Sequence, residues 1–271
     1  MRIGFAFCAE GVAHEEIVRF VNAARWVATE VFSGDIEVIV LILSDEPLPT
    51  ELCAPLVDCL IHARPSLITK PELALLRFGS SCADLDHLVI SRFGGRFYPT
   101  HLRKLLPHHL HSRAGASIPQ YRYQDEESAP ATIGDLAHDF ECHLLGSCIG
   151  RTDKLDLQPD VFLFSRQTVD ELLRRQWLSS QTGFALECSA FLLSNDIRVE
   201  TPTLALSPHD HRPYPYDPRA ACERLRLLAR KFGGLGKDAM RNRFETFCNL
   251  RRRYYQYDLT TRYSEEVLQK V

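Results

Sequence analysis

The sequence lacks the short motifs that mark several large enzyme classes. It contains no Gly-x-Ser-x-Gly, no Walker phosphate-binding loop, no His-Glu-x-x-His and no Gly-x-Gly-x-x-Gly. No Cys-x-x-Cys pair occurs among its nine cysteines. Hydrolase-elbow, P-loop, zinc-protease, Rossmann, zinc-ribbon and thioredoxin-like chemistries therefore have no support in the motifs.

Long hydrophobic runs are also missing. The longest strongly apolar run, Ile36 to Leu43, is far shorter than the roughly 20 residues that a membrane-spanning helix needs. No basic segment followed by an apolar run opens the chain, so we expect no signal peptide. The odd number of dispersed cysteines favours free thiols in a reducing compartment. We expect a cytoplasmic protein that is peripheral to a membrane at most.

The N-terminal part of the chain has the pattern of an α/β fold. Arg2–Cys8 is a short apolar run typical of a buried strand, and His14–Phe32 has apolar residues at mostly helical spacing. Glu37–Leu43 is continuous and β-branched, as in a parallel strand covered on both faces. We predict a β-α-β unit with a right-handed crossover. The fold class is α/β, with a mostly parallel central sheet flanked by helices.

The rest of the chain continues this alternation. Further predicted elements are an amphipathic segment at Thr50–Ala63, a short strand at Pro65–Ile68, a helix at Pro71–Gly79, a strand at Asp86–Ile90, helices at Pro99–Leu110 and Ile133–Leu145, and two basic helical segments at Arg219–Phe232 and Asp238–Tyr257. We divide the chain into a domain over residues 1–213 and a basic helical C-terminal extension over residues 214–271 that packs on it.

Three signals follow one another between Leu144 and Pro213. They are a buried run that ends in an arginine (Val161–Arg166), a Gly-Phe-x-x-Glu (Gly183–Glu187) and a strand that ends in Glu-Thr-Pro (Ile197–Pro202). With the preceding helix and its Leu145-Gly146 pair, this order resembles the family 2 glycosyltransferases of GT-A type. The polyprenyl-phosphate branch, of the dolichol-phosphate-mannose type, is the most similar.

The resemblance implies a GT-A-like nucleotide-diphospho-sugar transferase fold and a set of site residues. Glu10 and Asp45, which follow the first two strands, match acids that contact the nucleotide-sugar. A plain turn before Pro47 is the alternative for Asp45. The resemblance also implies acceptor-binding residues, Arg122 and Arg212, and candidates for the general base, Asp153, Asp156 and Glu187.

The family's metal motif is missing from its expected place. The segment Ser91–Pro99 has Arg92, Gly94 and Arg96 where the family has two acids and a glutamine. An Asp-Leu-Asp at Asp84 precedes the strand, and we interpret it as a surface turn. Mg²⁺ or Mn²⁺ is therefore a possible cofactor whose usual motif is missing, and the cofactor is unknown. Either Arg92 and Arg96 replace the metal as fixed positive charge on the diphosphate, or the fold has kept only a binding role. A charged β-turn that binds no ligand is the further alternative for this segment.

Histidines offer two further interpretations. His209 and His211 form a His-x-His pair that could ligate a metal, although a polar loop is the commoner setting. His108, His109 and His111 follow the helix after Pro99, and we interpret them as structural residues that favour its dipole.

The C-terminal extension is basic, with eleven Lys and Arg against three acids between residues 219 and 253. It would suit an anionic membrane surface and a lipid-phosphate acceptor, or RNA, or it is a solvated helix face. The sequence predicts a glycosyltransferase, of hexosyltransferase type, that transfers a sugar from a nucleotide donor to a phosphate-bearing or other acceptor. The alternative is an inactive GT-A-like scaffold, and a nucleic-acid binder is a third. The donor, the sugar, the acceptor and the oligomeric state are undefined.

Overall fold

The structure, a computed structural model, describes residues 1–9, 12–32, 36–44, 59–62, 71–82, 84–92, 97–123, 131–150, 156–178, 183–206, 214–233 and 235–271. The chain divides into two compact units. Unit 1 comprises Met1–Gln120, Pro159–Gln181 and Phe191–Leu204. Unit 2 comprises Tyr121–Gln158, Thr182–Ala190 and Ala205–Val271.

Unit 1 contains a seven-stranded sheet with the order β3-β2-β1-β4-β7-β5-β8. Its strands are β1 (Arg2–Cys8), β2 (Glu37–Ser44), β3 (Cys59–His62), β4 (His87–Arg92), β5 (Ala116–Ser117), β7 (Val161–Ser165) and β8 (Val199–Glu200). β1 is parallel to β2 and β4, and β3 is parallel to β2, whereas β7 is antiparallel to β4 and β5. The predicted α/β fold with a mostly parallel sheet is confirmed. β6 (Gln120–Tyr123) and β9 (Thr203–Leu206) form a separate two-stranded sheet.

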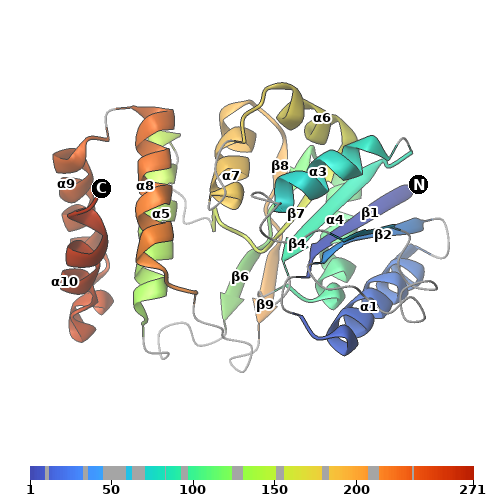
Figure 1. Ribbon diagram of the computed structural model, residues 1–271, viewed down its shortest axis with the longest axis horizontal. Coiled ribbons are helices and arrows are strands. Elements are labelled where there is room, and N and C mark those ends of the chain that lie inside the picture. Colours follow the sequence, from blue (N-terminus) through green and yellow to red (C-terminus); the bar gives the residue numbers. More distant parts are fainter. Residues whose placement is uncertain are drawn as a thin grey trace. The chain divides into compact units, whose positions relative to one another are not determined.

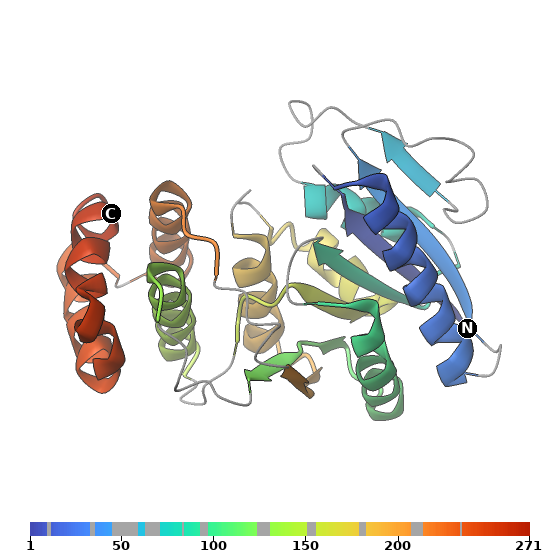
Figure 2. The same cartoon turned by 90° about the horizontal axis from the view of Figure 1, so that it is seen from below.

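Helices cover both faces of the large sheet (Figure 1). On one face lie α1 (His14–Phe32) and α4 (Leu102–Ser112), which pack against each other; a 3₁₀ turn (Pro99–His101) precedes α4. On the other face lie α3 (Pro71–Ser81) and α6 (Arg166–Arg174). The view from below shows α1 lying across β1 and β2 (Figure 2).

The alternation of side chains in β1 explains this layering. The Phe7 ring packs edge-on against Phe20 of α1, with centroids 4.6 Å apart. Gly4 points to the opposite face, where an added Cβ would lie 3.0 Å from Leu88 and 2.7 Å from Leu85. Successive residues of a strand face opposite sides, and β1 is covered on both, so its sequence is apolar throughout after Arg2.

Unit 2 is built mainly of helices: α5 (Ile133–Cys148), α8 (Pro218–Phe232), α9 (Lys237–Leu250), a 3₁₀ segment (Arg252–Tyr257) and α10 (Leu259–Tyr263), which continues into a π-helical turn (Ser264–Leu268). α7 (Phe184–Ser194) contributes residues to both units. The core of unit 2 is aromatic. The Phe140 ring of α5 lies 5.0 Å from Phe244, 5.6 Å from Phe247 and 6.1 Å from Tyr263, measured between centroids.

Most predicted helices and strands are confirmed, with three corrections. The predicted amphipathic segment at Thr50–Ala63 ends in a strand, β3, whose four residues pair with β2. The second basic helix ends at Leu250 and not at Tyr257, because a 3₁₀ segment follows and places Tyr254 fully in the core. The strand predicted at Ile197–Pro202 is only the two residues of β8. The strand predicted at Pro65–Ile68 lies outside the described residues.

Candidate functional site

Three parallel strands of unit 1 end together at one edge of the sheet. Cys8, the last residue of β1, is paired with Leu43 of β2 and with Arg92, the last residue of β4. Ligands of open α/β sheets bind at this carboxyl edge. The chain therefore leaves the sheet there just before Glu10 and Asp45 and at Arg92. The described strand ends that precede Glu10, Asp45 and Arg96 in the chain therefore lie at one edge.

The structure describes the predicted site residues unevenly. It describes the backbone of Arg92, at the end of β4, and of Arg122, within β6. Asp156 and Glu187 are described with their side chains. The remaining predicted residues lie outside the described part of the chain: Glu10, Asp45, Arg96, Asp153, His209, His211 and Arg212.

The residues at the end of β4 do not fit the divalent cation that the resemblance implies. The segment from Ser91 to Pro99 contains no carboxylate. Asp84 and Asp86 lie at the opposite, amino edge, where Asp86 accepts a hydrogen bond from the Arg2 N–H at 2.9 Å. The Arg2 guanidinium donates to Asp84 at 2.7 Å. The length of β4, about 16 Å at ~3.3 Å per residue, separates these acids from the carboxyl edge.

The two described acid candidates both have partners within unit 2. Glu187 is almost fully buried on α7, and its carboxylate lies 3.2 Å from Lys231 Nζ. Asp156 accepts hydrogen bonds from the Tyr214 hydroxyl and from the Gln158 N–H, each at 2.9 Å. A role of either carboxylate as a general base stays a prediction.

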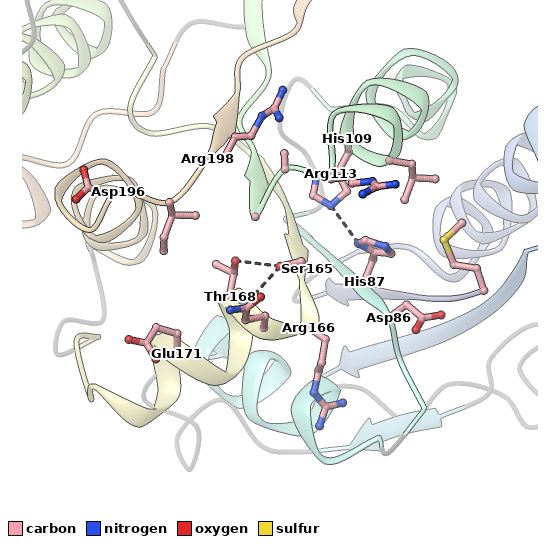
Figure 3. Close-up of a pocket in the computed structure, with 16 residues that line it drawn as sticks. Asp86, His87, His109, Arg113, Ser165, Arg166, Thr168, Glu171, Asp196 and Arg198 are labelled. Carbon is pink, nitrogen blue, oxygen red and sulfur yellow. Dashed lines mark hydrogen bonds between the residues drawn. The ribbon is translucent and has the colours of Figure 1, made fainter.

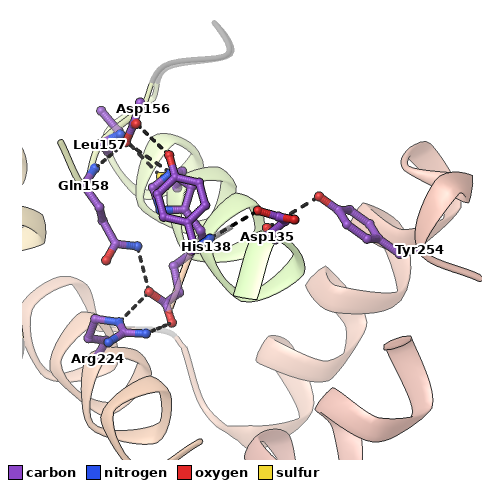
Figure 4. Close-up of polar contacts among 10 residues, drawn as sticks. Asp135, His138, Asp156, Leu157, Gln158, Arg224 and Tyr254 are labelled. Carbon is purple, nitrogen blue, oxygen red and sulfur yellow. Dashed lines mark hydrogen bonds and ion pairs between the residues drawn. The ribbon is translucent and has the colours of Figure 1, made fainter. Parts of the chain in front are cut away.

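Sequence reasoning missed three residues that surround Asp156. His138 Nε2 lies 3.1 Å from Asp156 Oδ1 and 3.7 Å from the sulfur of Cys142, one turn along α5 (Figure 4). The Tyr214 ring stacks on His138, with centroids 3.5 Å apart and 13° between the planes. The His-x-x-x-Cys spacing was visible in the sequence, but nothing in it placed Asp156 beside this pair.

A pocket of about 680 Å³ opens at the amino edge of the sheet in unit 1 (Figure 3). It is lined by the starts of β1 and β4, the end of α4 and the first turn of α6. Its charged side chains include Asp86, Arg113, Arg166 and Arg198. This pocket lies at the edge opposite to the ends of β1, β2 and β4, so it is separate from the predicted donor site.

A histidine pair forms part of this pocket. His87 Nδ1 lies 3.1 Å from His109 Nε2, and His109 Nδ1 lies 2.9 Å from Ser117 Oγ. Burial, and secondly the neighbouring His87, lower the pKa of His109 to about 4, and burial lowers the pKa of His87. His109 is thus neutral near pH 7, and the interpretation that it favours the helix dipole is wrong. Its role is structural, because its buried ring links His87 to Ser117 through hydrogen bonds.

Comparisons with known proteins show the fold. No protein-family model matches the chain, and no curated protein matches it. Mannosyl-3-phosphoglycerate synthase from Rubrobacter xylanophilus is 11% identical, covering 86% of this chain and 74% of that one, with a TM-score of 0.55. Glucosyl-3-phosphoglycerate synthase from Mycobacterium tuberculosis, solved with Mn²⁺, UDP and glucosyl-3-phosphoglycerate, is 14% identical over 85% of this chain and 80% of that one, with a TM-score of 0.54.

These similarities establish a GT-A-like α/β fold, as the sequence predicted. Within the described residues, no helix is both long and apolar enough to cross a membrane.

Proposed function

We propose that the chain binds a nucleotide-sugar at the carboxyl edge of the unit 1 sheet and transfers the sugar to an acceptor. The observation that carries this proposal is the common end of β1, β2 and β4, where Cys8 is paired with both Leu43 and Arg92. In this proposal Asp45 and Glu10 contact the nucleoside part of the donor. The fold class, as seen in the two synthases, is consistent with this chemistry.

Fixed positive charge takes the place of a metal in this proposal. Arg92 and Arg96 bind the diphosphate, and their guanidinium groups stabilise the charge that develops on the leaving nucleoside diphosphate. Gly94 and Gly95, between them, leave room for backbone N–H groups to approach an anion. Because this segment has no carboxylate, no step requires Mg²⁺ or Mn²⁺.

The acceptor is proposed to carry a phosphate group. Arg122 and Arg212 are the predicted phosphate contacts, and Asp153, Asp156 or Glu187 is the predicted base that takes the proton of the attacking hydroxyl. We assign these residues by resemblance to the polyprenyl-phosphate branch of family 2. All five belong to unit 2.

A lipid-phosphate acceptor and a place at the cytoplasmic membrane surface are narrower proposals. They rest on the cationic C-terminal helices, yet several of those cations have carboxylate partners inside unit 2. Arg224 pairs with Glu141 at 2.6 Å, and Lys231 pairs with Glu187 at 3.2 Å. These pairs favour the interpretation in which much of the basic character of the tail is structural.

A thermal-shift screen with UDP- and GDP-sugars, with and without Mn²⁺, tests the proposed function. We expect one nucleotide class to raise the melting temperature without metal, and Arg92→Ala to abolish that rise. Arg19→Ala, at an exposed position of α1, is the matched control and should keep it. Stabilisation that requires Mn²⁺ would contradict the arginine role. No response to any nucleotide would favour the scaffold, and salt-sensitive binding of RNA would favour the nucleic-acid binder.

A further inference from the structure

Three potential metal ligands of different chemistry converge within unit 2. His138 and Cys142 lie one helical turn apart on α5, so their side chains share one face. Asp156 returns to the same place from the segment after the helix. The imidazole nitrogen, the sulfur and a carboxylate oxygen all lie within 4.8 Å of one another, and all three side chains are largely buried.

The arrangement around His138 Nε2 is unusual for a simple hydrogen bond. This one nitrogen faces both Asp156 Oδ1 at 3.1 Å and Cys142 Sγ at 3.7 Å. An imidazole nitrogen carries either one proton or one lone pair, which points in a single in-plane direction. It can therefore make a well-aligned hydrogen bond with one of these partners but not with both. A cation between the three atoms could be coordinated by all of them, because each atom would then direct an electron pair at the same point.

Two of the three ligand spacings agree with tetrahedral coordination, and the third, between the sulfur and the carboxylate oxygen, is within 4.8 Å. Zinc bonds of about 2.0–2.1 Å to nitrogen and about 2.3 Å to sulfur, at tetrahedral angles, place those two ligand atoms about 3.6 Å apart. The corresponding nitrogen-to-oxygen spacing is about 3.4 Å. The observed separations of 3.7 Å and 3.1 Å are within a few tenths of an ångström of these values.

Neighbouring groups already orient the ligand atoms. The Leu157 N–H donates to Cys142 Sγ at 3.3 Å, a contact that stabilises a thiolate. The Tyr214 hydroxyl donates to Asp156 Oδ2, and the Gln158 N–H donates to Oδ1, the oxygen that also faces the histidine. The stacked Tyr214 ring fixes the imidazole plane. Hydrogen bonds of this kind orient the ligands in protein metal sites and tune their affinity (Figure 4).

We propose that His138, Cys142 and Asp156 form a binding site for a divalent transition-metal ion of the zinc type. A mixed nitrogen, sulfur and oxygen set suits Zn²⁺ or Co²⁺ and does not suit Mg²⁺, which prefers oxygen ligands. Three protein ligands leave a fourth position for water or another donor. The site goes beyond the proposed function, because it uses none of the residues at the carboxyl edge of unit 1. It gives Asp156, one of the three candidates for the general base, the role of a metal ligand instead.

Cobalt(II) titration of the full-length, metal-free, reduced chain tests the proposal. We expect a thiolate-to-cobalt charge-transfer absorption that saturates at one equivalent and disappears when Zn²⁺ is added. Cys142→Ser should abolish this absorption, and Asp156→Asn should weaken cobalt binding at least tenfold. Cys248→Ser, at another buried free cysteine of unit 2, is the matched control and should leave the titration unchanged.

Absence of the absorption in the unmodified chain, or its persistence in Cys142→Ser, would overturn the proposal. Since Cys142→Ser alters a buried position, X-ray absorption of the zinc-loaded unmodified chain gives an independent readout. One sulfur neighbour at about 2.3 Å with nitrogen and oxygen neighbours at about 2.0–2.2 Å is expected. A zinc shell without sulfur would contradict the site even if the variant failed to fold.

Discussion

The Glu141 carboxylate lies 2.6 Å from Arg224 Nε and 3.0 Å from its terminal nitrogen, and this pair joins α5 to α8 in unit 2. Glu141 is completely buried, and the Arg224 side chain is 16% exposed. The side-chain amide of Gln158 donates to the same carboxylate at 2.7 Å. The buried carboxylate thus accepts three hydrogen bonds, two from Arg224 and one from Gln158, which offset the loss of water around it.

Removing one charge of this pair should destabilise the protein strongly. Glu141→Gln leaves the Arg224 guanidinium buried without a counter-charge, and we expect a loss of about 3–5 kcal/mol in the free energy of unfolding. Urea denaturation followed by circular dichroism measures this loss. Glu15→Gln, in an exposed pair with Arg19, is the control and should cost less than about 1 kcal/mol. If both substitutions lowered the free energy of unfolding equally, the buried pair would be no more important for stability than the exposed one.

Stability should fall in acid because of His109. The folded protein lowers the pKa of His109 from 6.5 to about 4, so between these values the unfolded chain binds the proton and the folded chain does not. Neutral His109 therefore contributes roughly 3 kcal/mol to the free energy of unfolding. This contribution is fully present above about pH 6.5 and is lost as the pH falls toward about 4. His87, whose pKa is also lowered, changes stability in the same direction.

Denaturation at several pH values between 4 and 7 measures this dependence. His109→Gln should flatten the curve, since the group that takes up the proton on unfolding is gone. His111→Gln is the control, because His111 lies at the exposed end of α4 and contacts only the Pro107 carbonyl of its own helix among the contacts described. An unchanged slope in His109→Gln would refute this assignment.

Gly134 should not tolerate a side chain. A Cβ at this position would lie 1.9 Å from the backbone oxygen of Tyr214 and 2.8 Å from its carbonyl carbon. Gly134→Ala must therefore move the backbone of the segment that carries the Tyr214 ring, and we expect a loss of at least about 1–3 kcal/mol. Gly236→Ala meets no atom within 4 Å and should change stability by less than about 1 kcal/mol. Wild-type stability of Gly134→Ala would contradict this packing.

The layered core of unit 1 could be predicted because its signals are local and strong. The β-branched run Glu37–Leu43 and the apolar spacing of His14–Phe32 each specify one structure. β3 could not be predicted, since three apolar residues followed by His62 do not distinguish a strand from part of a helix. Only pairing with β2, which is a tertiary contact, decides between them.

The side-chain clusters could not be predicted from spacing. His87 and His109 are 22 residues apart, on a strand and a helix, and they meet only because α4 packs against the sheet. Asp156 comes back to His138 by way of a segment that has no periodic signal. The donor-site residues were inferred from the order of motifs, and the register of β1, β2 and β4 brings the strand ends that precede them together.

The most direct test of the central claim is hydrogen–deuterium exchange of the full chain with and without UDP- and GDP-sugars. Bound nucleotide-sugar should slow amide exchange in the peptides that contain the ends of β1, β2 and β4, at Cys8, Ser44 and Arg92. The peptides at the amino-edge pocket, around Arg113 and Arg166, should exchange as before. Protection confined to the amino-edge pocket, or no protection by any nucleotide-sugar, would contradict a donor site at the carboxyl edge.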